Sequence, residues 1–523
     1  MMDDMISVCA GSRFAVSHTK NPPMFRSVIK SVARNTSVLA GQQAITLASS
    51  FVVMLLLPKY VGPVLYGWLF VASSVKRIFT VFVEFGGSYL IAKKIARDPD
   101  QTSQVVMDSF GLRFVFGVLS FVATIIYAYT AGYGATFALI IIIYGTGLLW
   151  QGGITTMYSA YQGREVMRYT SYGAVAERVF HTVVVIVAVL VGMDIVFLAI
   201  LLITGSLLNL IVLLLFSRNI SFSLRSVNWR AAVRQIGEAV PYFLLAAFST
   251  IYYRIDSIML SHMCPDEVAG WYGGAYGLFD SLNFPYLLTI AVFPVLARLW
   301  KAESETHNRT LHKTLEITLI TGIPAAVAAV LFARNIVSVF YGLQDYGQSV
   351  LLLQVLAGGL LFLYADMILG TALLAADKQW HQSIVAFLAI PLNIGLNLWL
   401  IPMFQEIMDN GAIGASIATT CTELVILISF ISLLPRGVLA GFRTGVVLKG
   451  LLSGGIMAAS ILMIMQYPMP WPLAGVLGLG AYVGSLFVFK TFEPAEEEFL
   501  RTLLTVSGAG RAFRALFQRT PAR

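Results

Sequence analysis

Charged residues are scarce in this sequence. Only 12% of its 523 residues are Asp, Glu, Lys or Arg, whereas 58% are hydrophobic. A soluble domain carries about 25% charged residues, so this deficit excludes a soluble protein. The hydrophobic residues recur in runs of about 20, the length that a helix needs to cross a hydrocarbon core of about 30 Å. Because the runs are continuous rather than alternating, they predict membrane-spanning helices.

Cysteine and histidine are also few. The three cysteines (Cys9, Cys264 and Cys421) form no CxxC motif, and the six histidines form neither HxxxH nor HExxH. These absences argue against a disulfide scaffold and the usual zinc motifs, so we expect no metal site and no bound cofactor. No GxxxxGK[ST] motif occurs, so direct ATP hydrolysis is not expected. The loops are too short to hold a catalytic domain, and we do not expect an enzyme.

Hydropathy divides the chain into about 14 candidate spans. They predict an all-α, polytopic membrane protein with about 14 transmembrane helices. The expected spans are 36–57, 65–91, 110–130, 134–157, 171–191, 195–216, 239–261, 269–296, 314–333, 349–374, 383–401, 412–434, 446–466 and 470–489.

The basic residues lie almost entirely on one side of these spans. If the N-terminus is cytoplasmic, only Lys59 and Arg334 of the 35 Lys and Arg residues fall in outer loops. This asymmetry follows the positive-inside rule and predicts cytoplasmic N- and C-termini in the cell membrane. The net charge of +8 is therefore explained by topological anchors, and we expect no nucleic-acid partner.

Two segments of the chain resemble each other. "YVGPVLYGWLF" (60–70) and "HMCPDEVAGWYGG" (262–274) each carry a Gly-Trp pair after the first helix of a six-helix block. The repeat predicts two parallel lobes around a midplane site, an arrangement typical of transporters. The expected parts are a cytoplasmic N-terminal tail (1–33), an N-lobe (34–217), a cytoplasmic linker (218–235), a C-lobe (236–435), helices 13 and 14 (436–490) and a cytoplasmic amphipathic basic tail (491–523).

Several motifs occur in an order found in one known family. "VGPVLYGWLF", "AYQGREVMRY", "IYYRIDSIML" and "PLNIGLNLWLIP…GAIGASIATT" resemble the polysaccharide (lipid-linked oligosaccharide) flippase family of the multidrug/oligosaccharidyl-lipid/polysaccharide exporter superfamily. The resemblance implies two six-helix lobes around a central cavity plus two extra C-terminal helices. It also implies flipping of an isoprenoid-pyrophosphate-linked oligosaccharide, of the O-antigen or exopolysaccharide type, to the outer leaflet by alternating access.

The resemblance further implies partners and an energy source. We expect a lipid-linked glycan substrate, the lipid bilayer of the inner (plasma) membrane, and the glycan polymerase and glycosyltransferases of the same pathway as partners. A sodium or proton gradient is the expected energy source. Two alternatives remain open at this point. A lipid II flippase would share the 14-helix plan and a cationic cavity, whereas a cation-coupled multidrug exporter would prefer a net-acidic cavity.

Charged residues inside the spans are the candidates for function. A charge at the bilayer centre costs about 2.5–3.5 kcal/mol, so such a residue faces a cavity or a partner. Arg77 and Glu84 are seven residues apart and share a helix face. Lys76 is about 100° around the helix from Arg77, so only one of the two points squarely at a cavity. Asp280 occupies the position that the repeat aligns with Arg77.

The stretch "IYYRIDSIML" (251–260) contains two opposite charges. Arg254 and Asp256 are two residues apart, hence about 200° apart on a helix, and cannot face each other. Thr250, Arg254, Ser257 and Ser261 form one polar stripe, which predicts a wet cavity along that face. Asp256 lies on the opposite side.

These charges fall into two groups by expected role. A guanidinium matches phosphate oxygens bidentately, so the basic residues are candidates for binding a pyrophosphate, with helix–helix ion pairs as the alternative: Arg254, Arg77, Lys76 and Arg178. The carboxylates are candidates for ion or proton coupling or for structural pairing: Asp280, Asp366, Asp256 and Glu84. For Asp256 we favour a structural role, as the partner of a basic residue on a neighbouring helix.

Overall fold

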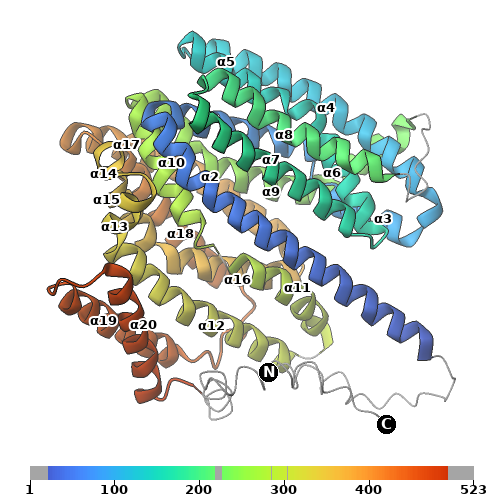
Figure 1. Ribbon diagram of the computed structural model, residues 1–523. Helices are drawn as coiled ribbons and strands as arrows, with labels where there is room; N and C mark the ends of the chain where they lie inside the picture. Colours follow the sequence, from blue (N-terminus) through green and yellow to red (C-terminus); the bar gives the residue numbers. More distant parts are fainter. Residues whose placement is uncertain (1–21, 218–226, 284, 303, 493–523) are drawn as a thin grey trace.

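A computed structural model describes residues 22–217, 227–283, 285–302 and 304–492 (Figure 1). Every regular element in these ranges is a helix, so the expected all-α fold is confirmed. The helices are α2 (Pro22–Glu84), α3 (Ser88–Arg97), η1 (Pro99–Gln101), α4 (Thr102–Thr130), α5 (Ala135–Thr146), α6 (Leu148–Gly163), α7 (Arg168–Val191), α8 (Ile195–Phe216), α9 (Trp229–Met263), α10 (Asp266–Asp280), α11 (Pro285–Ala302), α12 (Ser304–Leu331), α13 (Ala333–Phe340), α14 (Leu343–Tyr346), α15 (Ser349–Gly358), α16 (Leu360–Ala375), α17 (Gln379–Met408), α18 (Ala412–Leu433), α19 (Thr444–Ile464) and α20 (Trp471–Val488).

The number of membrane spans differs from the sequence-based expectation. Within the described residues, 11 helices are long and apolar enough to cross a membrane, or 12 if α15 and α16, which meet at 44°, count as one span. The predicted count of 14 is therefore not confirmed. The difference arises at two places. α2 covers the first two predicted spans as one element, and the eighth predicted span (269–296) is divided between α10 and α11.

A backbone break divides α2 into two helical halves. Gly62 has φ 74° and ψ 172°, a conformation outside the helical region. That region of backbone space is essentially restricted to glycine, because any Cβ would clash with the chain. Pro58 and Pro63 flank the break and remove two backbone donors from the helical ladder. The hydropathy pattern predicts two spans in this region, and the structure has two helical halves there, one on each side of Gly62.

Polar side chains set several other helix ends. Asp194 precedes α8 and accepts a hydrogen bond from the backbone N–H of Val196 at 2.8 Å, and Asn228 caps α9 in the same way through Ala231 at 3.2 Å. Such caps satisfy backbone donors that the first helical turn leaves free. At the other end of a helix, Asp409 adopts a left-handed conformation and terminates α17.

Two helices begin inside segments that the sequence assigns to a tail and to a linker. α2 begins at Pro22, so the second part of the expected N-terminal tail is helical and continuous with the first span. α9 begins at Trp229, inside the expected inter-lobe linker. Both helices extend beyond their apolar cores because polar residues can also form helix where no proline or cap stops it. The predicted C-terminal tail lies almost wholly outside the described residues.

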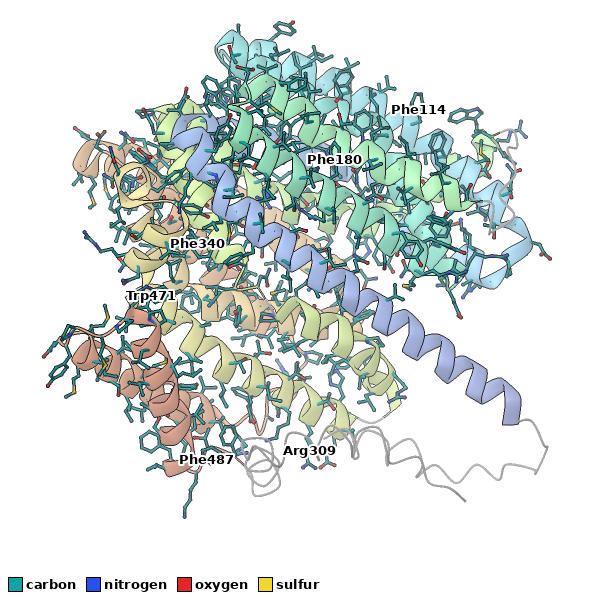
Figure 2. The ribbon with its side chains drawn as sticks, in the orientation of Figure 1. Phe114, Phe180, Arg309, Phe340, Trp471 and Phe487 are labelled. Carbon is teal, nitrogen blue, oxygen red and sulfur yellow. The ribbon has the colours of Figure 1, made fainter. Side chains whose placement is uncertain are left out.

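The helices gather on two sides of α2, α9 and α10. α4, α5, α6, α7 and α8 pack on one another and on α2, whereas α12 packs on α11, α15, α16 and α19, and α18 packs on α15, α16 and α17. In Figure 1 the first group lies along the top and α12, α19 and α20 lie at the bottom. Large apolar side chains such as Phe114 of α4 project from the outer faces (Figure 2), as expected where helices face lipid.

The two Gly-Trp pairs of the sequence repeat meet in space. A Cβ atom on Gly270 of α10 would lie 1.9 Å from the carbonyl oxygen of Pro63, and one on Gly67 of α2 would lie 2.8 Å from the carbonyl oxygen of Asp266. Trp68 reinforces this contact, because its Nε1–H donates to the Asp266 carboxylate at 3.0 Å. Small residues permit such close helix approach inside membranes. α2 and α10 thus touch backbone to backbone.

Candidate functional site

A cavity of about 270 Å³ lies where α2, α9, α10, α16 and α18 meet. It draws its lining from distant parts of the chain, and its walls mix aromatic, hydroxyl and charged side chains. The lining residues are Arg77, Thr250, Tyr253, Arg254, Tyr276, Phe279, Asp280, Asn283, Leu356, Gly359, Leu363, Met367, Thr419, Thr420 and Glu423. We refer to it as the central cavity.

Two arginines from different halves of the chain face this cavity. Arg77 comes from α2 and Arg254 from α9. Neither forms an ion pair within 4 Å among the residues that the structure describes. The guanidinium of Arg254 lies 5.5 Å from the ring centre of Tyr276. Arg254 and Arg178 act on Arg77 as like charges, and Asp280 acts on it as an opposite charge.

Lys76 points away from the central cavity, as expected of one of two neighbouring residues. A Cβ atom on Gly147 would lie 2.9 Å from its Nζ, which places the ammonium group against the join of α5 and α6. Glu177 of α7 is the carboxylate that acts on it. Arg178, also on α7, is within electrostatic range of Arg77 without lining the cavity. The structure therefore brings Arg77 and Arg254 together and leaves Lys76 and Arg178 outside the lining.

Glu84 belongs to a different polar group. Its carboxylate accepts from Gln151 Nε2 at 3.3 Å, and its backbone carbonyl accepts from the guanidinium of Arg113 at 3.2 Å. Among the described residues it forms no ion pair with Lys76 or Arg77. The buried Arg113 also donates to Ser88, Thr155 and Thr156, and its structural role was missed in the sequence.

Asp256 is held by neutral donors. Its Oδ2 accepts from Thr419 Oγ1 at 2.5 Å and from Tyr272 Oη at 3.1 Å, and its Oδ1 accepts from Asn397 Nδ2 at 2.7 Å. The predicted partnership with a basic residue is therefore wrong, because three uncharged donors from α10, α17 and α18 already satisfy the carboxylate. Arg254 and Asp256 point in different directions, as their 200° separation predicts.

The predicted polar stripe on α9 is confirmed over only half its length. Thr250 and Arg254 line the central cavity. Further along, Ser257 donates its hydroxyl to the backbone carbonyl of Arg254 at 2.7 Å, and Ser261 donates to that of Ile258 at 2.8 Å. Serine hydroxyls bond readily to the preceding helical turn, so periodicity alone overestimated the polar surface.

The remaining carboxylates lie at two cavities. Asp280 is exposed and lines the central cavity together with Arg77. Asp366 of α16 is buried and lines a second cavity of about 250 Å³. Glu423 of α18, which is not among the candidate residues named from the sequence, lines both cavities. It lies inside the predicted span 412–434, so the rule on intramembrane charges would have found it.

Comparison with known families decides what kind of protein carries this cavity. The model of the family described as "Polysaccharide biosynthesis protein" matches residues 32–300, which is more than half of the chain. The chain belongs to the polysaccharide flippase family. The overlapping model "Lipid II flippase MurJ" matches residues 169–471, and both groups fall within the multidrug/oligosaccharidyl-lipid/polysaccharide exporter superfamily.

Solved structures and one curated relative agree with this family. The flippase chain is similar in fold to a lipid II flippase MurJ in an inward closed conformation (TM-score 0.68, 14% identity, 88% of this chain and 98% of that chain). It is also similar to an inward-facing multidrug resistance MATE family transporter (TM-score 0.58, 15% identity, 75% and 93%). The capsular polysaccharide biosynthesis protein CapF of Staphylococcus aureus is 23% identical over 193 residues, 36% of this chain, and the match spans about half of that relative's length (47%).

These findings establish the class of the protein. It is a multi-pass membrane flippase or transporter, and its families and structural neighbours are transporters rather than enzymes. The neighbours share 14–15% identity with this chain, so they define its fold and not its substrate.

Proposed function

We propose that the protein flips an isoprenoid-pyrophosphate-linked oligosaccharide from the cytoplasmic to the outer leaflet of the inner (plasma) membrane. One observation carries the proposal. Arg77 and Arg254 come from the two halves of the chain, line one cavity, and have no ion-pair partner among the described residues. An anionic head group is the ligand that best compensates this arrangement.

The electrostatics favour a pyrophosphate. An unpaired charge within the membrane costs about 2.5–3.5 kcal/mol, so two facing guanidinium groups need an anion between them. Guanidinium groups bind phosphate oxygens bidentately through strong, charge-assisted hydrogen bonds. Arg178 adds to the positive potential at Arg77, and Asp280 offsets part of it. The bound pyrophosphate would therefore replace Asp280 as the main negative charge facing Arg77.

The transport cycle follows from the chain's two halves. We propose that residues 34–217 and 236–435 act as lobes that rock about the contact between α2 and α10, while residues 436–490 stand apart as helices 13 and 14. The isoprenoid tail stays in lipid during this motion. The asymmetry of Lys and Arg supports cytoplasmic N- and C-termini. A sodium or proton gradient would return the cavity to its starting conformation. The glycosyltransferases and the polymerase of the pathway would act before and after the flipping step.

A lipid II flippase is the second candidate, because the MurJ family model matches residues 169–471. Lipid II carries the same isoprenoid pyrophosphate, so the arginine argument applies equally. A multidrug exporter would need an acidic cavity for organic cations. Asp280 and Glu423 line the central cavity, but Arg77 and Arg254 line it as well, so the lining lacks the excess of carboxylates that an organic cation would require.

The test is flipping by the purified protein in liposomes. Wild type is expected to move a fluorescent isoprenyl-pyrophosphate oligosaccharide between leaflets, and Arg254→Ala to move it far more slowly at the same substrate concentration. A hydrogen bond to a charged group contributes about 1.5–3 kcal/mol, so loss of the guanidinium weakens binding by about tenfold to a hundredfold. Arg254→Lys keeps the positive charge but loses the paired N–H donors of the guanidinium group, so an intermediate rate of flipping is expected.

The matched control is Arg309→Ala. Arg309 is exposed near the start of α12 (Figure 2) and is not among the residues that line the central cavity, so its removal should leave flipping unchanged. Wild-type flipping by Arg254→Ala would remove Arg254 from the mechanism. Movement of lipid II but not of the oligosaccharide lipid would select the second candidate, and movement only of a cationic dye would refute both.

A further inference from the structure

Two buried carboxyl groups, Asp366 of α16 and Glu423 of α18, face each other between the two cavities. They are 5% and 4% exposed, and the two groups interact directly. Both line the second cavity, and Glu423 also lines the central cavity with Arg77 and Arg254. The pair therefore lies where the proposed substrate site in the central cavity adjoins the second cavity.

The hydrogen-bond partners of this pair are incomplete. Tyr252 Oη donates to Glu423 Oε1 at 3.0 Å. Glu423 Oε2 and both oxygens of Asp366 receive no hydrogen bond from the described residues, and neither does Gln382 Oε1, which lines the same cavity. Buried acceptors are normally satisfied, because each unsatisfied group costs about 1–3 kcal/mol. Four buried acceptor oxygens at the second cavity therefore have no hydrogen-bond donor among the described residues.

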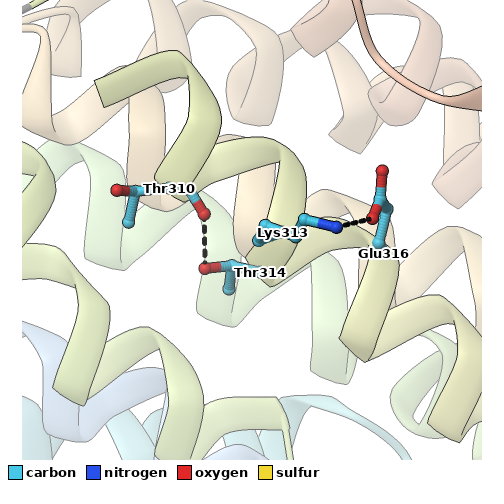
Figure 3. Close-up of polar contacts among 4 residues, drawn as sticks. All are labelled: Thr310, Lys313, Thr314 and Glu316. Carbon is cyan, nitrogen blue, oxygen red and sulfur yellow. Dashed lines mark hydrogen bonds and ion pairs between the residues drawn. The ribbon is translucent and has the colours of Figure 1, made fainter. Parts of the chain in front are cut away.

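Two other buried carboxylates show what a satisfied site looks like here. Glu316 of α12 is 4% exposed and pairs with Lys313 at 3.2 Å (Figure 3). Asp256 has three neutral donors. Asp366 has neither a cation nor a donor among the described residues. Asp366 therefore differs from Glu316 and Asp256, whose carboxylates both have partners.

The charges around the pair are mostly acidic or neutral. Glu423 faces Asp366 on α16 and Tyr252, Tyr253 and Asp256 on α9. Two unit charges 4 Å apart repel by about 4 kcal/mol at an effective dielectric constant of 20. Two ionised carboxylates also offer only acceptors to each other, whereas one proton turns their contact into a hydrogen bond.

We propose that Asp366 and Glu423 form an exchangeable proton-binding site. One proton is held between the two carboxyl groups, and a second can enter or leave from the cavity side. A metal ion is disfavoured, because the described residues contain no group of three or more His, Cys, Asp or Glu side chains suited to hold one. A single proton instead supplies a hydrogen bond between one oxygen of Asp366 and Glu423 Oε2.

The position of Glu423 links this proton to the central cavity. Proton uptake makes the pair less negative and so favours an anion beside Arg77 and Arg254. By reciprocity, a bound anion favours proton uptake to the same extent. This link to transport rests on the proposed function, whereas the proton site itself does not.

Infrared spectroscopy of the purified full-length protein tests the site without any substrate. Wild type at neutral pH is expected to show the C=O stretching band of a protonated carboxyl group, and D366N/E423Q to lose it. Glu316→Gln is the matched control, because this equally buried carboxylate has a lysine partner, and the band should persist. Each single variant, D366N or E423Q, should move the pH at which the band disappears, since the remaining carboxyl has lost its partner.

Two results would overturn the proton site. One is a band that is unchanged in the double variant and in both single variants. The other is a band that disappears on adding sodium at fixed pH and returns on its removal, which would make the pair a sodium site. Asn and Gln are close in size to the residues they replace, and the single variants provide an independent measurement if the double variant does not fold.

Binding of inorganic pyrophosphate separates this inference from the proposed function. At each pH the wild type and D366N/E423Q are compared, so that protonation of the probe itself cancels. As the pH falls, the affinity of wild type for pyrophosphate should increase more than that of the double variant. A carboxyl band without pyrophosphate binding would refute the anionic substrate and leave the proton site standing. Equal pH trends in both proteins, with no band, would refute the proton site alone.

Discussion

Gly270→Ala is expected to force α10 away from α2. A Cβ atom at this position would lie 1.9 Å from the carbonyl oxygen of Pro63 and 2.6 Å from its carbonyl carbon. Both are backbone atoms, so no side-chain rotation relieves the clash. The helices must separate by about 1 Å before the contact becomes tolerable, because the repulsive wall is steep. Trp68 would then lose its 3.0 Å hydrogen bond to Asp266.

The expected loss is about 1–3 kcal/mol of unfolding free energy, the usual range for overpacking. Gly277→Ala on the same helix is the matched control, since the atoms nearest to its Cβ, the hydroxyl oxygens of Tyr341 and Tyr66, are 3.9 Å away. Replacing glycine inside a helix stabilises it by about 0.5–1 kcal/mol through backbone entropy. This gain applies to both variants, so their difference isolates the steric contribution.

The measurement is the apparent Tm of each purified variant in detergent, supported by denaturant titration. Gly270→Ala should unfold below wild type, and Gly277→Ala at or above it. Equal Tm values for the two variants would refute the backbone contact between α2 and α10. They would also remove the contact about which the two lobes are proposed to rock.

Two further substitutions test the structure around the site. Asp256→Ala leaves the donors of Asn397, Thr419 and Tyr272 without an acceptor and should lower the unfolding free energy by about 2 kcal/mol or more. Asp280→Ala removes an exposed carboxylate and should leave the unfolding free energy unchanged. Equal losses in the two variants would argue against the Asp256 contacts. Gly62→Ala imposes a Cβ on a backbone at φ 74° and ψ 172°, and should destabilise the protein by about 1–3 kcal/mol in thermal unfolding; an unchanged Tm would place the break of α2 elsewhere.

The membrane class and the all-α fold followed from the sequence alone. Helix is the natural spanning element for continuous apolar runs, because every backbone donor must be satisfied without water. The same pattern could not count the spans. Gly62 leaves α2 a single element with an internal break, and the eighth predicted span is divided between α10 and α11. Hydropathy registers apolar length, whereas breaks depend on backbone conformation.

The candidate site was predictable in part. The cost of burying charge in lipid singles out Arg77, Arg254 and Asp280 in the sequence, and all three line the central cavity. The same principle applies to Glu423, a fourth charged residue of this lining. It could not show that Lys76 turns towards the join of α5 and α6, because periodicity gives the angle between neighbours and not the surroundings of either.

By itself, the sequence determined where charge lies along each helix and therefore that Arg254 and Asp256 point in different directions. Only the tertiary structure decided what each one meets. Arg254 faces a cavity shared with α2, and Asp256 meets three neutral donors on other helices. The physical reason is that side-chain direction is a local property of the helix. Its partners come from segments far away in the chain, and packing alone brings them within reach.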